Sequence, residues 1–261
     1  MPQDYDLIIV GGGMVGATLA LALADTELNI ALVDALPLDP QPARPAQTVS
    51  GYDSRVSAVS AASERIFTRL GVWPLIDSER RCAYQHMCVW DAEGTGEIRF
   101  DALALNESRL GHIVENVRLQ QALLGRLEQT SVDMLGNRKI ETLVREDAGW
   151  RLKLVGGEAL CAPLVVAADG ARSKVRELAG FALREWDYLH HAIVTTVQVA
   201  EPRLGSASCQ RGRWHFCPCL IGRVNTTAPL SGRYCQKPQT GSWRWMMLRL
   251  RARWVRQLKI G

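Results

Sequence analysis

The chain has 261 residues, of which 47% are hydrophobic, 22% charged and 7% aromatic. This balance is typical of a globular protein with one large core or two modest ones, and it excludes a disordered chain, a collagen and a coiled coil. The seven cysteines are odd in number and lack framework spacing, so we expect reduced thiols rather than a secreted disulfide scaffold. No apolar run of about eighteen residues occurs, so we expect a cytoplasmic protein without a membrane-spanning helix or a signal peptide.

The net charge of +4 is unevenly distributed along the chain. Residues 203–261 hold ten Arg and two Lys and no Asp or Glu, so they carry +12 while residues 1–202 carry −8. At ordinary usage, a stretch of this length without an acidic residue is expected well under about 1% of the time. We therefore predict that the reading frame is lost near Arg203, and that residues 203–261 are an aberrant basic tail that does not pack against the core.

The first part of the chain has the pattern strand, glycine turn, helix, strand. A β-branched apolar run precedes Gly11, helix-forming residues follow Gly16, and a second apolar run ends at Asp34, which can accept hydrogen bonds from a ribose. GxGxxG spacing alone is a weak signal, but this context is the one that the dinucleotide-binding motif requires. The alternative is a glycine-rich turn in an ordinary βαβ unit, with Asp34 as a capping residue.

The residues of this turn have separate physical roles in such a motif. Gly11 permits the tight turn, Gly13 lets a pyrophosphate approach the backbone, and Gly16 lets the helix pack closely against the strand. The N-terminus of the helix that follows offers free N–H groups and a positive dipole end to the phosphates. The segment therefore predicts a Rossmann-type crossover that binds a dinucleotide.

We expect a helix to begin after Arg55. The apolar residues spaced for one buried stripe of this helix are Val59, Ala62, Ile66, Phe67 and Leu70. An arginine at a loop-to-helix junction is either a phosphate ligand or a member of a surface ion pair, and the sequence does not distinguish between the two roles.

The middle of the chain predicts a hairpin, a second helix and a series of short strands. Alternating apolar residues on both sides of the turn-like segment 93–96 indicate a β-hairpin over 86–100. Leucines on one face predict a helix over 116–127, and we interpret Glu115 before it as a cap rather than a catalytic acid. Short strands with glycine turns are expected over 132–168.

A DG pair, Asp169 and Gly170, follows the last of these strands. A helical segment with Ser173 near its start comes next, and by itself such a pair is a turn and a cap. His190 and His191 open a further apolar run and are interpreted as structural. No zinc-protease motif, paired CxxC or nucleophile elbow occurs in the sequence.

The glycine motif, Arg55 and the DGxxSxVR segment at 169–176 together resemble the flavin-dependent aromatic hydroxylases of the p-hydroxybenzoate hydroxylase type. Within this group, segments 55–73, 86–94, 110–124 and 186–197 are similar to the ubiquinone-biosynthesis branch. The resemblance covers residues 4–202. It implies an α/β fold, with a Rossmann-type FAD-binding domain interrupted by a partial β-rich substrate domain and incomplete at the C-terminus.

The resemblance also implies domain boundaries. The FAD-binding domain would be discontinuous, formed by residues 1–80 and 108–180. A partial substrate domain would comprise residues 81–107 and 181–202, and the basic tail would occupy residues 203–261.

The site residues implied by the resemblance bind FAD. The pyrophosphate would lie on Gly11, Gly13, Met14, Val15 and Gly16, and the adenosine ribose on Asp34, where many relatives have Glu. Arg55 would lie near the flavin phosphates or the isoalloxazine ring.

Two further positions of the implied site come from later in the chain. Asn116 stands where members of the wider family often have an arginine that helps to hold FAD. Asp169 and Gly170 match a motif that the family associates with both FAD and NAD(P)H. The resemblance implies no particular catalytic residue and no metal ligand in this sequence.

The implied reaction uses NAD(P)H as co-substrate and O₂ to hydroxylate the ring of a polyprenylphenol in ubiquinone biosynthesis. Because a polyprenyl tail partitions into lipid, the protein would work peripherally at the inner membrane or in an assembly of pathway enzymes. Family members carry a second flavin motif of the form GDAAHxxxPxxGQGxN, but this chain contains no Gly-Asp dipeptide. We therefore expect a truncated and impaired enzyme.

Other interpretations remain open from the sequence. The chain could be a noncatalytic nucleotide-binding fragment, or a different flavin oxidoreductase such as a prenyl reductase. In the tail, Cys209, His215, Cys217 and Cys219 could bind zinc, although their spacing departs from the usual finger. The arginines and tryptophans of the tail could also bind anionic lipid or nucleic acid, although no specific nucleic-acid partner is expected.

Overall fold

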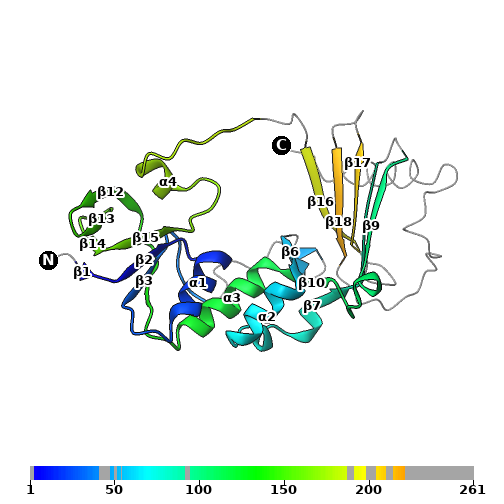
Figure 1. Cartoon of the computed structure of the whole chain (residues 1–261), viewed down its shortest axis with the longest axis horizontal. Coiled ribbons are helices and arrows are strands. Elements are labelled where there is room, and N and C mark those ends of the chain that lie inside the picture. Colours follow the sequence, from blue (N-terminus) through cyan, green and yellow to red (C-terminus); the bar gives the residue numbers. More distant parts are fainter. Residues whose placement is uncertain are drawn as a thin grey trace. The chain divides into compact units, whose positions relative to one another are not determined.

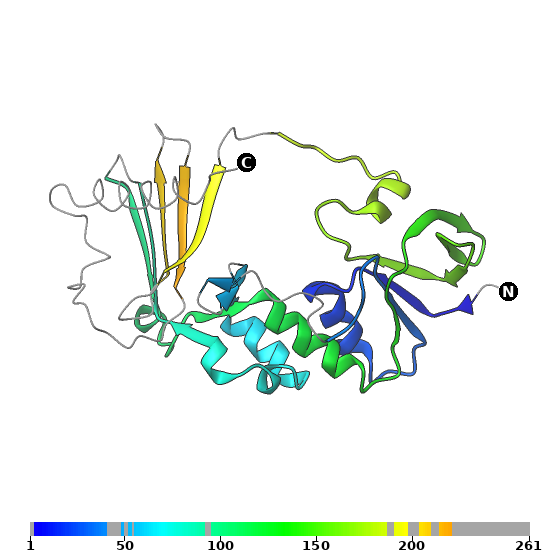
Figure 2. The same ribbon diagram turned by 180° about the vertical axis from the view of Figure 1, so that it is seen from behind.

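The computed structural model describes residues 3–40, 48–49, 52–53, 55–91, 95–186, 191–197, 204–209 and 214–220. Figure 1 and Figure 2 show its ribbon from two opposite sides. From residue 187 onward, only backbone strands are described.

A parallel sheet forms from strands between residues 7 and 167 (Figure 1). In spatial order, its strands are β11 (Asp133–Leu135), β3 (Ile30–Val33), β2 (Leu7–Val10) and β15 (Leu164–Ala167). Every residue of β2 and β3 is buried, which is why these strands read as unbroken apolar runs rather than alternating ones. Helix α1 (Met14–Leu23) is the crossover between them, as the sequence predicts.

The two faces of this sheet are covered by different layers. Leu7 and Ile9 contribute to a cluster with the helices, whereas Ile8 and Val10 contribute to a cluster with a second sheet. That second sheet consists of β1 (Gln3–Asp4), β14 (Ala159–Ala162), β13 (Gly149–Leu154) and β12 (Ile140–Glu146). The strands expected over 132–168 are therefore present, but they divide between two sheets, and the sequence interpretation did not foresee β14.

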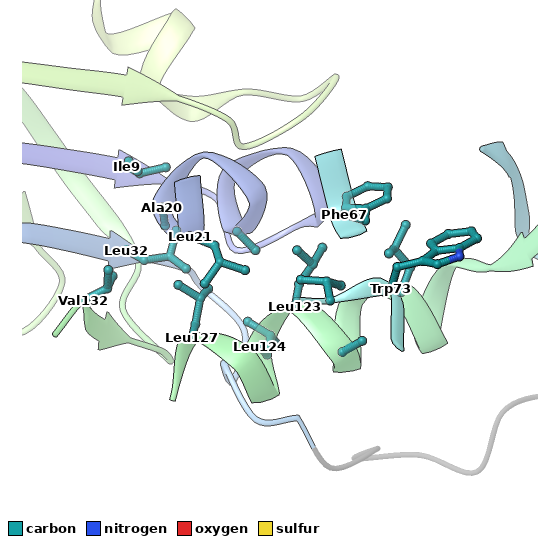
Figure 3. Close-up of a cluster of buried hydrophobic side chains, with 14 of the residues drawn as sticks. Ile9, Ala20, Leu21, Leu32, Phe67, Trp73, Leu123, Leu124, Leu127 and Val132 are labelled. Atoms are coloured by element: carbon teal, nitrogen blue, oxygen red, sulfur yellow. The ribbon is translucent and has the colours of Figure 1, made fainter. Parts of the chain in front are cut away.

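Helix α3 (Asn116–Leu127) has the bounds that the sequence predicts and lies beside α1 in both ribbon views (Figure 1, Figure 2). Figure 3 shows the cluster of buried side chains to which the two helices and the parallel sheet contribute, with Leu21, Leu123 and Leu127 among them. Leu123 and Leu127 are fully buried. This packing fixes the start of α3 relative to the glycine turn that precedes α1.

The remaining elements include a three-stranded sheet, a hairpin and several short segments. A three-stranded antiparallel sheet consists of β6 (Val56–Ser60), β10 (Gly111–Glu115) and β7 (Arg81–Tyr84). The short elements are β4 (Thr48–Val49), β5 (Tyr52–Asp53), η1 (Trp73–Leu75), η2 (Ser78–Arg80), η3 (Leu103–Leu105) and α4 (Lys174–Leu178). The predicted hairpin is present as β8 (His86–Asp91) and β9 (Glu97–Asp101).

The prediction that a helix begins directly after Arg55 was wrong, because the helix begins later in the structure. Residues Val56–Ser60 form strand β6, and helix α2 (Ala61–Arg69) begins only after Ser60, whose side chain accepts a hydrogen bond from the N–H of Ser63 at 3.2 Å. Val59 is buried as part of the strand, and Ile66 is half exposed rather than part of a buried stripe. The apolar residues had helical spacing although Val59 belongs to the strand and the others follow it, so the spacing predicted too early a start of the helix.

The segments described after residue 190 are all strands. The strands β16 (His191–Val197), β18 (Trp214–Leu220) and β17 (Leu204–Cys209) join β8 and β9 in one sheet, with β17 parallel to β8. We expected residues 203–261 not to pack against the core. In the structure β17 pairs with β8, while no side chain of these residues is described. The reading frame of the tail and the proposed domain boundaries stay predictions. Within the described residues, no helix is long and apolar enough to cross a membrane.

Candidate cofactor site

In the glycine turn after β2, the fold requires glycine at positions 11 and 16 but not at position 13. A Cβ on Gly11, whose φ is +108°, would lie 2.3 Å from the carbonyl oxygen of Ala168, and a Cβ on Gly16 would lie 1.9 Å from the carbonyl oxygen of Gly11. A Cβ on Gly13 would meet nothing within 4 Å. The backbone at Gly13 therefore faces open space, as the approach of a pyrophosphate requires.

The N-terminus of α1 offers hydrogen-bond donors to that space. Gly13 is the N-cap residue, no side chain caps the helix, and no acidic residue lies in the first turn. The first amides of a helix have no carbonyl partner within it, and those of Met14 and Val15 belong to this group. With the positive end of the helix dipole, they suit an anionic ligand.

Asp34 follows β3 and holds two loops through its carboxylate. Oδ2 accepts the N–H of Gly12 at 2.6 Å, and Oδ1 accepts the N–H of Leu36 at 2.8 Å. The capping interpretation therefore describes part of what Asp34 does. Because each carboxylate oxygen has a further lone pair, Asp34 can also accept a ribose hydroxyl, and that role stays a prediction.

Gln120 is a residue of this site that the sequence interpretation missed. Its Nε2 donates to the carbonyl oxygen of Gly12 at 3.1 Å, so α3 supports the glycine turn directly. The signal that could have revealed it is its spacing of four residues from Asn116, which places both on one face of α3.

Asn116 and Arg55 are linked to each other. The N–H of Asn116 donates to the carbonyl oxygen of Arg55 at 3.0 Å, and Asn116 Oδ1 accepts the hydroxyl of Ser57 at 2.6 Å. The Arg55 side chain is exposed, and its guanidinium forms no hydrogen bond or ion pair with any part of the chain that the structure describes. Both roles considered for Arg55, phosphate ligand and surface ion pair, therefore stay predictions.

Asp169 and Gly170 form the turn between β15 and α4. The Asp169 carboxylate accepts hydrogen bonds from the hydroxyl of Ser173, from the N–H of Lys174 at 2.6 Å and from that of Val175 at 3.2 Å. Gly170 has a φ of +82°, which favours glycine. The turn-and-cap interpretation thus accounts for the carboxylate of Asp169 and the backbone of Gly170, and a role with FAD or NAD(P)H stays a prediction.

The structure brings most of the predicted residues to one edge of the parallel sheet. Gly11, Asp34 and Asp169 follow the carboxyl ends of β2, β3 and β15, which are neighbours in the sheet. Ligands of open α/β sheets bind outside this edge. Gln120 reaches the same turn from α3, and Asn116 lies one helical turn before it. The arrangement fits the diphosphate and ribose of a dinucleotide.

The interpretation of Glu115 as a cap is confirmed for its position but not for its side chain. It occupies the N-cap position of α3, but its side chain makes no capping hydrogen bond. Instead the buried carboxylate accepts the N–H of Asp53 at 2.7 Å and contacts Arg80 Nη1 at 3.3 Å.

The histidines and cysteines suggest no metal site in the described part of the molecule, where no group of three or more His, Cys, Asp or Glu could hold an ion. The side chains of the four candidate zinc ligands in the tail lie outside the described residues, as does His190.

Comparison with known families decides the kind of dinucleotide. The family described as FAD binding domain matches residues 4–240. The chain belongs to this family. FAD is therefore the cofactor expected at the glycine turn, and the open backbone at Gly13 and the uncapped α1 fit its diphosphate.

The FAD-family chain is similar to hydroxylases of ubiquinone biosynthesis. It is 39% identical over 199 residues to 3-demethoxyubiquinol 3-hydroxylase of Escherichia coli, covering 75% of this chain and 49% of the relative. It is 36% identical over 203 residues to the ubiquinone hydroxylase UbiL of Rhodospirillum rubrum, covering 77% and 46%. To the human ubiquinone biosynthesis monooxygenase COQ6 it is 31% identical over 218 residues, covering 79% and 46%. The chain thus spans about half the length of the curated relatives it matches.

Solved structures agree on the fold. PqsL of Pseudomonas aeruginosa, in complex with 2-aminobenzoylacetate, matches with a TM-score of 0.56 and 22% identity over 72% of this chain and 49% of its own. The p-nitrophenol 4-monooxygenase PnpA of Pseudomonas putida matches with a TM-score of 0.54 and 21% identity, covering 69% and 44%. At this level of identity the similarity concerns the fold alone.

Proposed function

We propose that the chain contributes the FAD-binding region of an aromatic monooxygenase of ubiquinone biosynthesis, which hydroxylates the ring of a polyprenylphenol with O₂ and NAD(P)H. The observation that carries this proposal is the open backbone at Gly13, in front of an uncapped helix N-terminus at the carboxyl edge of the parallel sheet. The similarity to hydroxylases of ubiquinone biosynthesis supports the class of substrate.

The residues of the chain would bind and orient the cofactor. The amides of Met14 and Val15 would donate to the diphosphate, Asp34 would accept from the ribose, and Arg55 would reach a phosphate or the flavin ring. Bound FAD would supply the redox chemistry with NAD(P)H and O₂. No side chain of this chain is assigned a proton-transfer role.

We further propose that the isolated chain hydroxylates poorly. It contains no Gly-Asp dipeptide and so no counterpart of the second flavin motif expected in the family. Without that motif a bound flavin ring would be more open to water, which would lower the yield of hydroxylation. The proposed loss of reading frame near Arg203 would account for the missing motif, and reading the downstream nucleotides in all three frames tests it.

The polyprenyl tail of the proposed substrate would require access from lipid, so we propose peripheral contact with the inner membrane or with other enzymes of the pathway. Sedimentation of the full chain with vesicles of anionic and of neutral lipid tests the membrane contact. Absence of the protein from both vesicle pellets would contradict it.

The experiment for the proposed function uses the purified full chain and added FAD. We expect bound flavin at one equivalent, bleaching of its absorbance by NADH or NADPH without oxygen, and little hydroxylated polyprenylphenol in air. A flavin that stays bound but is reduced by neither nucleotide would favour a noncatalytic nucleotide-binding fragment. Absence of flavin binding would overturn the proposal as a whole.

A further inference from the structure

Glu115 is a buried carboxylate to which no role in the cofactor site has been assigned. It ends β10 and is 2% exposed. A buried carboxylate is costly unless its oxygens are hydrogen-bonded or paired with a charge. Oε1 accepts the N–H of Asp53 at 2.7 Å and Oε2 lies 3.3 Å from Arg80 Nη1, so each oxygen has a partner from a different segment.

These contacts belong to a closed ring of interactions that returns to α3. Asp53 Oδ1 accepts the N–H of Arg55 at 2.9 Å, and the carbonyl oxygen of Arg55 accepts the N–H of Asn116 at 3.0 Å. Asn116 is the residue after Glu115, so the ring closes through the chain itself. It holds the backbone of Arg55 between β5 and the first residue of α3.

The ring holds the backbone of Arg55 but does not involve its charged side chain. The guanidinium has no partner in the described part of the chain. Hydrogen bonds to a charged group are stronger than those between neutral groups, provided that donor and acceptor are held in place. Displacement of the Arg55 backbone would therefore weaken any contact that its guanidinium makes with an anionic ligand.

We propose that Glu115 is a positioning residue, which fixes the Arg55 segment against the start of α3 and thereby sets the affinity for FAD. The proposal rests on the proposed function, because it requires FAD to be the ligand of Arg55. Glu115 itself would contact Asp53 and Arg80 rather than the cofactor.

The test compares Glu115→Gln with Glu64→Gln in the full chain. The amide of the first variant keeps the size of the side chain but carries no charge, so its oxygen accepts the N–H of Asp53 more weakly and it no longer pairs with Arg80. Glu64 is a matched control because it too is largely buried and ion-paired, with Arg109 Nη2 at 2.7 Å, but it has no contact with the Arg55 segment among the described residues. FAD affinity is measured by flavin fluorescence, and unfolding is measured separately by heating without FAD.

We expect Glu115→Gln to weaken FAD binding about tenfold, the equivalent of about 1.4 kcal/mol. Glu64→Gln should lower the unfolding temperature but leave the FAD dissociation constant within about twofold. In an Arg55→Ala background, Glu115→Gln should cause no further loss of affinity, since the group it positions is absent.

Three results would overturn the inference. One is unchanged FAD affinity in Glu115→Gln, and another is a full additional loss in the Arg55→Ala background. The third is an equal loss of affinity in Glu64→Gln, which would indicate a general effect of stability. Failure of the unsubstituted chain to bind FAD would overturn the proposed function itself, so the two failures are distinguishable.

Discussion

Gly13 and Gly16 differ in what a side chain would meet, although both belong to the same motif. A Cβ at Gly16 would collide with the backbone of Gly11, whereas one at Gly13 would enter open space. The φ of Gly13 is −69°, which any residue adopts. Gly16 is therefore required by the fold, whereas the absence of a side chain at Gly13 leaves space for a ligand.

This difference predicts opposite outcomes for two alanine substitutions. Gly16→Ala should lower the free energy of unfolding by about 3 kcal/mol, because the backbone of the turn must move. Gly13→Ala should leave stability unchanged or raise it by up to about 1 kcal/mol, since the unfolded chain loses freedom. It should nevertheless weaken FAD binding about 100-fold by filling the space of the diphosphate.

Urea unfolding and flavin titration of the two variants check this prediction. A Gly13→Ala protein that binds FAD as well as the unsubstituted chain would contradict the placement of the diphosphate. Unchanged stability in Gly16→Ala would contradict the close packing of α1 on the turn.

At the scale of elements, α3 connects the core to the cofactor site. Its buried leucines pack against α1 and the parallel sheet (Figure 3). Gln120 donates to the carbonyl oxygen of Gly12 in the glycine turn, and the N–H of Asn116 donates to the carbonyl oxygen of Arg55. The apolar spacing of α3 predicted its bounds correctly, because a single helix with one buried face carries a clear period. Gln120 could not be predicted from that period, since its partner is a backbone atom more than a hundred residues away.

Truncation of a buried leucine of α3 should therefore cost more than truncation of an exposed one elsewhere. Leu123 is fully buried and Leu103 is 75% exposed. We expect Leu123→Ala to lower the free energy of unfolding by about 2–5 kcal/mol and Leu103→Ala by less than about 0.5 kcal/mol. Urea unfolding measures both, and equal effects would contradict the packing of α3.

Helix α2 is joined to β10 and its preceding loop by a charged cluster. Glu64 lies 2.7 Å from Arg109 Nη2 and 3.0 Å from His112 Nδ1. Burial raises the pKa of Glu64, but the hydrogen bond from Arg109 and the charges of His112 and Arg109 outweigh it, so that the net pKa is lowered. Burial lowers the pKa of His112 and outweighs the opposing effect of Glu64.

Both shifts make the protein less stable in acid. Because each folded-state pKa lies below its unfolded value, the unfolded chain binds more protons, and stability rises with pH. The contribution of His112 should be complete above about pH 6.5 and that of Glu64 above about pH 4.5, and each should be lost as the pH falls through the folded value.

Urea unfolding between pH 8 and about pH 4 tests this dependence. We expect His112→Gln to flatten the decline of stability below about pH 6.5, while His86→Gln, at an exposed position on β8, should retain it. An identical pH dependence in His112→Gln and the unsubstituted chain would contradict the role of His112.

For the whole molecule, the sequence was most informative where short segments follow one another in the chain. The crossover from Gly11 to Asp34 could be predicted because strand, turn and helix are contiguous there, and its residues determine one another locally. The ring through Glu115 could not, because it joins β5, η2 and α3 across the fold. Likewise the start of α2 was predicted too early, because Val59 fits the apolar pattern of a strand and also that of a helix.

The central claim is that this chain binds FAD through the turn between β2 and α1. Calorimetric titration of FAD into the purified full chain, with Gly13→Ala measured in parallel, tests it most directly. We predict one equivalent of bound FAD for the unsubstituted chain and strongly weakened binding for the folded variant. A folded chain that releases no heat and gains no thermal stability with FAD would contradict the claim.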